Sequence, residues 1–193
     1  MMRNDVTIIK FLIEHKNEEL NIRTISKQIH MDYKNIHSIL KRLETISLIK
    51  VELFGKSKRV TLNNTIHPLL FEAEFERRKD VLKDKNIAVM LNSFKRGLKS
   101  KMYVLLLFGS YAKKTQMKNS DIDLLFICPD GMEQTFEKDI HRISQSMHLP
   151  LHTLFFSESQ FIEMAYSRES NVGQEALKNN IILYGTEQYY EMI

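Results

Sequence analysis

Two carboxylates and a Gly-Ser turn carry the most specific chemical signal in this chain. Gly109 and Ser110 follow the apolar run 105–108, and Asp121 and Asp123 come after ten further residues. In a strand, residues i and i+2 point to the same face, so the two carboxylates are expected to project side by side. Carboxylates held this close repel each other unless a cation lies between them. A Gly-Ser turn that opens a helix offers backbone N–H groups and a hydroxyl to phosphate. The pattern therefore predicts a site for a metal-bound nucleoside triphosphate.

This pattern of Gly109-Ser110, ten residues and then Asp121-Ile122-Asp123 resembles the signature of the DNA polymerase beta-type nucleotidyltransferase superfamily. Within that superfamily, the short chain around the motif is similar to the minimal nucleotidyltransferase (MNT) group. The resemblance is strong over residues 105–127 and weaker over the rest of the chain. The other reading of the motif is a hairpin-like turn with two solvated aspartates.

The resemblance implies a role for each motif residue. Gly109 and Ser110 would hold the triphosphate of ATP or another NTP, and Asp121 and Asp123 would bind the Mg²⁺ or Mn²⁺ that bridges it. Asp121, Asp123 and Ser110 are thus the expected catalytic residues. The implied reaction is the attack of a hydroxyl on the α-phosphorus with pyrophosphate leaving, where a metal ion neutralises the developing charge.

The chain departs from the family where a third carboxylate usually completes the metal site. No Asp or Glu lies between Asp139 and Glu158, and the expected strand over 151–156 carries His152 or Thr153 at the place of the acid. His152 is either a base or ligand, or a partly buried polar residue at the start of a strand. Nucleotide binding is therefore expected, and transfer is left open.

Two lysines follow the Gly-Ser turn. Lys114 stands where many relatives have glycine, which is a second departure from the family. Lys113 and Lys114 either contact the phosphates or are solvated.

The elements that must position these residues alternate from residue 102 onward. Strands are expected over 102–108, 121–127, 151–156 and 181–185, with helices over 133–147, 158–166 and 171–179 and a short helix after Ser110. The first strand is nearly all apolar, as expected of a buried central strand. Cys128 is the only cysteine and is expected to be a buried thiol.

The first third of the chain has the pattern of a winged helix-turn-helix domain. Helices are expected over 6–13, 23–29 and 33–43, the last capped by Asp32, followed by strands over 49–54 and 59–62. Residues 1–65 hold 12 Lys/Arg against 7 Asp/Glu, whereas the rest holds 16 against 17. The basic charge therefore predicts a polyanion partner for this part, and the fold pattern predicts double-stranded DNA.

In that geometry the third helix enters the major groove and the hairpin tip reaches the phosphates or the minor groove. Lys and Arg supply affinity independent of sequence, while Asn35, His37 and Ser38 are candidate base readers. The alternatives are a solvated helix face with a basic turn, or a winged helix that contacts protein. The expected DNA-binding residues are Tyr33, Lys34, Asn35, His37, Ser38, Lys41, Arg42, Lys56, Lys58 and Arg59.

The predicted class is thus α+β, with a winged helix-turn-helix over 1–65, a helical connector over 66–100 and a small nucleotidyltransferase-fold α/β domain with a mixed sheet over 101–193. The polar turn 63–68 marks the first boundary. The charges of the connector helix 69–82 are expected to form mostly a solvated face, and this helix could pair with its copy in a homodimer.

Composition places the chain among ordinary globular proteins, with 43% apolar and 27% charged residues. No apolar stretch approaches the ~18 residues of a membrane span, and the start lacks a signal-peptide pattern, so we expect a cytoplasmic protein without a membrane partner.

The leading functional reading is a DNA-binding protein whose nucleotidyltransferase domain transfers a nucleoside monophosphate to a protein or other hydroxyl. By resemblance to MNT antitoxins, the acceptor could be a tyrosine of a HEPN-type toxin, with the winged helix repressing the chain's own promoter. The alternative is a transcription regulator whose degenerate domain only senses nucleotide.

Overall fold

The computed structural model describes residues 3–55, 57–63 and 65–193. They fall into two compact units, Met1–Glu76 and Arg77–Ile193, and the division lies within helix α4 (Pro68–Val81). Each helix in the described parts of the chain is too short or too polar to cross a bilayer.

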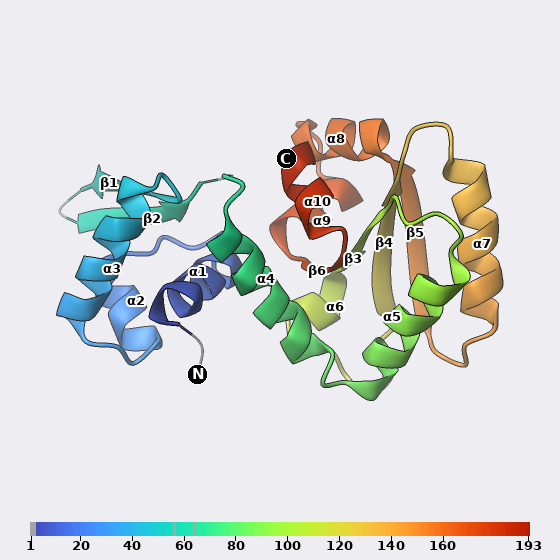
Figure 1. The fold of residues 1–193 in the computed structure, drawn as a ribbon, viewed down its shortest axis with the longest axis horizontal. Coiled ribbons are helices and arrows are strands. Elements are labelled where there is room, and N and C mark those ends of the chain that lie inside the picture. Colours follow the sequence, from blue (N-terminus) through green and yellow to red (C-terminus); the bar gives the residue numbers. More distant parts are fainter. Residues whose placement is uncertain (1–2, 56, 64) are drawn as a thin grey trace. The chain divides into compact units, whose positions relative to one another are not determined.

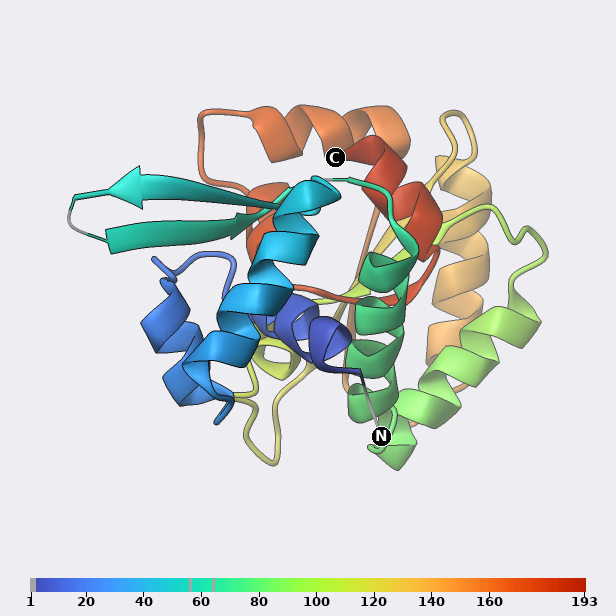
Figure 2. The ribbon, with the colours of Figure 1, turned by 60° about the vertical axis from the view of Figure 1, so that its left-hand side comes forward.

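The first unit places helices before a β-hairpin (Figure 1). The helices are α1 (Asn4–Glu14), α2 (Ile22–Gln28) and α3 (Tyr33–Thr45), and the hairpin pairs β1 (Ile49–Phe54) with β2 (Ser57–Leu62) in antiparallel register. Asp32 caps α3 as predicted, because its carboxylate accepts hydrogen bonds from the backbone N–H groups of Lys34 and Asn35. Figure 2 shows the hairpin projecting beyond the helices of this unit, so the winged helix-turn-helix prediction is confirmed.

Spacing along α3 decides which of its side chains form the core of the first unit. Ile36, Ile39, Leu40 and Leu43 recur every three or four residues and are buried. Ile25 of α2 and Val60 of β2 are buried as well. The polar residues of α3 therefore stay on its exposed side, which is the side that a recognition helix needs.

The second unit is built on a four-stranded sheet in the order β5-β4-β3-β6. β3 pairs antiparallel with both β4 and β6, and β4 pairs parallel with β5, which confirms the predicted mixed sheet. The elements are α5 (Lys85–Gly97), β3 (Val104–Leu107), α6 (Gly109–Ala112), β4 (Ile122–Cys128), α7 (Glu133–Gln145), β5 (Leu151–Ser157), α8 (Glu158–Tyr166), α9 (Val172–Lys178), β6 (Ile181–Tyr184) and α10 (Thr186–Met192).

Successive side chains of each strand point to opposite faces of the sheet, and helices cover both faces. Leu105, Leu124 and Phe126 pack in one core with Phe94 of α5 and Phe136 of α7. The residues between them in the strands are also buried but face the other way. Figure 1 shows α5 and α7 on one side of the sheet and α8, α9 and α10 on the other.

The structure tests three further predictions, which concern Cys128, the first strand of the sheet and the charged face of α4. Cys128 is buried as predicted, and burial raises the pKa of its thiol to about 11, so it remains a core thiol. Met102 is 70% exposed and precedes β3, so the central strand is shorter than predicted. The expectation of a mostly solvated charged face on α4 was incomplete, because Glu74 and Arg77 are buried.

Candidate functional site

The Gly-Ser turn lies just after the end of β3, at the start of α6. Gly109 has φ +64°, a left-handed conformation that favours glycine. A Cβ placed on Gly109 would lie 2.1 Å from Oδ2 of Asp123, a distance that real atoms do not tolerate. Glycine at this position therefore lets the turn and the carboxylate come into direct contact.

Asp123 is held to the turn by its backbone as well. The Phe108 N–H donates to the Asp123 carbonyl at 3.1 Å, next to the last β3–β4 pair, Leu107 opposite Leu124. The Asp123 side chain is 25% exposed, whereas Asp121 is exposed and precedes β4 by one residue. The structure thus places a half-buried and an exposed carboxylate two residues apart, at the same end of the sheet as the Gly-Ser turn.

Strand register resolves which residue lies opposite Asp123. In the parallel β4–β5 pair, His152 is the partner of Asp123, and Thr153 is the partner of Leu124. The Nδ1 atom of His152 lies 3.0 Å from Oδ1 of Asp123, and the imidazole is 57% exposed. His152, and not Thr153, therefore occupies the place where the resemblance led us to expect a third acid.

The two lysines after the turn have different surroundings. Lys113 Nζ forms an ion pair with Glu175 of α9 at 2.8 Å, and both side chains are partly exposed. Lys114 has φ +57°, again in the left-handed region. A left-handed non-glycine residue costs roughly 1–2 kcal/mol, so this conformation would favour the glycine that the family resemblance implies at this position.

The side chains at this end of the sheet offer a divalent cation two carboxylates, those of Asp121 and Asp123. Among the described residues, no cluster of three His, Cys, Asp or Glu side chains could hold a metal by itself. Mg²⁺, however, is usually bound by one or two carboxylates together with substrate phosphates and water. Asp121 and Asp123 beside a turn suited to phosphate match that donor set.

Sequence reasoning missed three residues at this end of the second unit. Glu175 reaches Lys113 across 62 positions of sequence. Arg77 donates through Nη2 to the carbonyl of Asn180 at 2.5 Å, across 103 positions, directly before β6 begins. These contacts join residues distant in sequence, and no local pattern indicated them.

The expected DNA-binding residues lie on the exposed side of α3 and on the hairpin. Arg59 is partly buried, with its guanidinium 5.8 Å from the Phe54 ring centroid, and Lys56 lies outside the described residues. The Tyr33 ring stacks on His37. It also lines a hollow with residues of α2 and with Leu53 of the β1–β2 hairpin, which is called the wing from here on. The exposed members of the set are Tyr33, Lys34, Asn35, His37, Ser38, Lys41, Arg42 and Lys58.

The second unit matches a known protein-family model. The family model described as "Polymerase beta, Nucleotidyltransferase" matches residues 92–189, which is half of the chain and spans the Gly-Ser turn, both carboxylates and His152. No curated protein sequence matches the chain.

Similar solved structures include AF1382 from Archaeoglobus fulgidus, which is 14% identical with a TM-score of 0.36 and covers 44% of this chain and 91% of its own. A toxin-antitoxin with AMP-PNP is 20% identical with a TM-score of 0.37, covering 56% and 77%. MepR, a transcription regulator of the Staphylococcus aureus multidrug efflux pump MepA, is 18% identical with a TM-score of 0.35, covering 49% and 80%. None of these scores is high enough to establish a shared fold.

Proposed function

The chain belongs to the Polymerase beta nucleotidyltransferase family, and we propose that its second unit transfers a nucleoside monophosphate from ATP or another NTP to a hydroxyl acceptor. The observation that carries this proposal is the contact between Gly109 and Asp123. It brings a turn suited to phosphate against a carboxylate suited to a cation, with Asp121 two residues away. A solvated pair of aspartates on a hairpin would have no reason to pack on a left-handed glycine.

The residues of the chain have separate tasks in the proposed reaction. Ser110 and the backbone of the turn bind and orient the triphosphate, while Asp121 and Asp123 would hold Mg²⁺ or Mn²⁺. When bound, the metal neutralises charge on the phosphates and the leaving pyrophosphate. His152 orients the Asp123 carboxylate through the 3.0 Å contact and borders the place where an acceptor hydroxyl would enter.

The test is transfer of label from α-labelled ATP, with Mg²⁺ or Mn²⁺, to hydroxyl acceptors that include the chain itself and proteins encoded beside it. Asp123→Asn and Asp121→Asn should each lower transfer about 100-fold or more, since the metal contributes several kcal/mol of charge stabilisation. Asp139→Asn is a matched control, because this aspartate lies on α7 and pairs with Arg142. Equal transfer by all three variants would exclude the proposed site.

The second candidate function is a regulator that binds nucleotide without turnover. The observation that favours it is His152 at the place of the third acid, opposite Asp123. Binding of a non-hydrolysable ATP analogue at the same affinity as ATP, without pyrophosphate release from ATP, would select this candidate. Release that depends on Asp123 would select the transferase.

We further propose that the first unit binds double-stranded DNA through α3 and the wing. The basic charge of residues 1–65 and the exposed polar side of α3 support this assignment. A cytoplasmic antitoxin that modifies a HEPN-type toxin and represses its own promoter, as a homodimer on a two-fold operator, would use both units. Binding to the upstream promoter fragment, measured against a shuffled duplex, tests the DNA assignment.

A further inference from the structure

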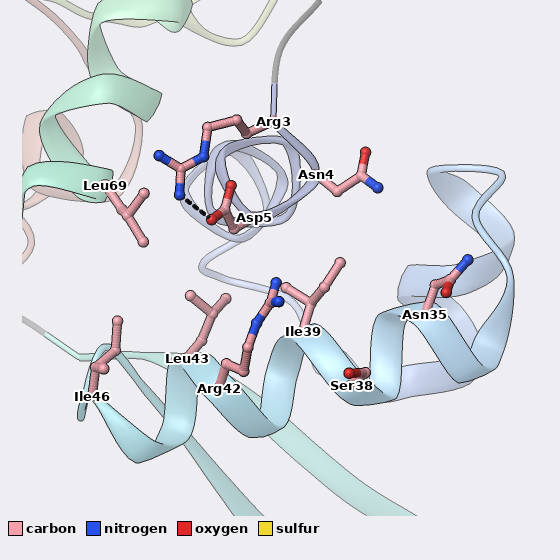
Figure 3. Close-up of a pocket in the computed structure, with 10 residues that line it drawn as sticks. All are labelled: Arg3, Asn4, Asp5, Asn35, Ser38, Ile39, Arg42, Leu43, Ile46 and Leu69. Atoms are coloured by element: carbon pink, nitrogen blue, oxygen red, sulfur yellow. Dashed lines mark hydrogen bonds and ion pairs between the residues drawn. The ribbon is translucent and has the colours of Figure 1, made fainter.

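A hollow of about 880 Å³ opens between the start of α1 and one flank of α3 (Figure 3). It lies within the first unit, and its volume falls within the range of sites for small molecules. It is lined by Arg3, Asn4, Asp5, Asn35, Ser38, Ile39, Arg42, Leu43, Ile46 and Leu69. The nucleotidyltransferase chemistry uses none of these residues.

Only some of the polar residues of α3 face this hollow. Asn35, Ser38 and Arg42 line it, whereas Tyr33 lines a different hollow beside the wing. Lys41 lines neither of these hollows. One flank of α3 therefore faces the wing, while the other faces a separate recess at the start of α1.

The lining combines an apolar floor with a cationic rim. Ile39 and Leu43 are buried, and Ile46 is 42% exposed at the same hollow, although it is a large apolar residue. In Figure 3 the Arg42 side chain rises from α3 toward α1, while a dashed line joins Arg3 to Asp5. An exposed apolar surface beside a guanidinium suits an amphipathic partner.

The charges at the rim favour an anion. Asp5 is the only acidic residue among the described residues that line the hollow, and its carboxylate is engaged by Arg3 at 2.8 Å. Arg42 therefore contributes a positive charge that this carboxylate does not balance. The hollow also opens at the positive end of the α1 dipole, which adds to the attraction for an anion.

We propose that this hollow binds a small amphipathic organic acid. Its carboxylate would accept hydrogen bonds from the Arg42 guanidinium, which presents a planar fork suited to that group. Its apolar body would cover Ile39, Leu43 and Ile46. A bound acid would also cover Asn35, Ser38 and Arg42, so acid and DNA would exclude each other; this consequence rests on the proposed DNA binding.

The direct test uses the full chain and the fluorescent anion 8-anilinonaphthalene-1-sulfonate, displaced by octanoate or by octylamine. These two competitors share an apolar tail and differ in charge. We expect one probe per chain, displacement by octanoate at concentrations about tenfold lower than by octylamine, and about tenfold weaker probe binding in Arg42→Gln. Lys41→Gln, which removes a neighbouring cation outside the hollow, should bind the probe like the wild type.

Equal probe binding by Arg42→Gln and Lys41→Gln would overturn the proposal, and so would equal displacement by octanoate and octylamine. Thermal melts of each variant ensure that the probe reports on folded protein. The competition is tested separately, with octanoate expected to weaken duplex binding by the wild type and to have no effect on Ile46→Ser. If the chain binds no DNA, the displacement result still decides whether the acid site exists.

Discussion

The two units hold their candidate functional residues in opposite ways. In the second unit, Asp123 is fixed by strand pairing, by the hydrogen bond from Phe108, by contact with Gly109 and by His152. In the first unit, Lys34 and Lys41 stand exposed on the helix α3. Phosphoryl chemistry needs donors held within fractions of an ångström, whereas binding to a polyanion needs charge at the surface. Substitutions in the second unit are therefore expected to act by displacing side chains, and substitutions in the first unit by changing the surface charge.

The largest expected effect is that of Gly109→Ala on nucleotide transfer. A methyl group there meets Asp123 Oδ2, so the carboxylate and the turn must separate, and we expect a loss of about 100-fold or more in labelled transfer. Gly131→Ala is the matched control, because Gly131 also has a positive φ but has open space around its Cβ position. It should cost roughly 1 kcal/mol of stability and leave transfer intact. If both variants lose transfer equally, backbone strain and not the Asp123 contact is responsible.

The role of surface charge in the first unit is tested by the double variant Lys41→Ala with Arg42→Ala. Two lost phosphate contacts should lower the slope of log affinity against log salt by about 2 and weaken binding to duplex DNA. Lys85→Ala with Lys138→Ala removes the same charge from the second unit and should leave the slope unchanged. A slope unaffected by the α3 pair would remove this helix from the DNA interface.

The next test concerns Arg77, a buried charged residue of the second unit, replaced in the variant Arg77→Met. Its bond to the Asn180 carbonyl is short and buried, so we expect a loss of about 1.5–3 kcal/mol in the free energy of unfolding. The matched Arg78→Met should cost less, since its bond to the Leu183 carbonyl is 3.3 Å long and only partly buried. Urea unfolding followed by tyrosine fluorescence is suited to this comparison, because six of the seven tyrosines lie in the second unit and the chain has no tryptophan. Equal losses would show that burial of the bond is unimportant.

The smallest effect is expected at Asp130, whose carboxylate accepts hydrogen bonds from the hydroxyl and N–H of Ser159. The Ser159 hydroxyl, together with Ser157 and the Ser159 N–H, lowers the pKa of Asp130. A lowered folded pKa means that the stabilisation is present above the ordinary value of about 3.9 and is lost as the pH falls below it. Asp130→Asn should therefore be slightly less stable than the wild type at pH 7, and the difference should shrink at pH 3. A difference independent of pH would assign the effect to the amide substitution itself.

Much of the fold could be predicted because its signals are local. The capping of α3 by Asp32, the apolar spacing of α3 and the buried run of β3 each depend on residues within a few positions of one another. The boundary of β3 was less accurate, since Met102 is apolar and nevertheless exposed. On α4, amphipathic character did not reveal that Glu74 and Arg77 are buried, because their surroundings come from other parts of the chain.

The sequence by itself determined the winged helix, the mixed sheet and the motif at Gly109 and Asp123. The reason is that hydrophobic periodicity, turn chemistry and motif spacing depend on residues close together in the sequence. Only the tertiary structure decided that His152, and not Thr153, lies opposite Asp123, that Lys113 pairs with Glu175, and that Arg42 faces a recess away from the wing. The physical reason is that a one-residue change of strand register, or a turn of about 100° along a helix, moves a side chain to a different face. That choice is made by packing against residues far away in the sequence.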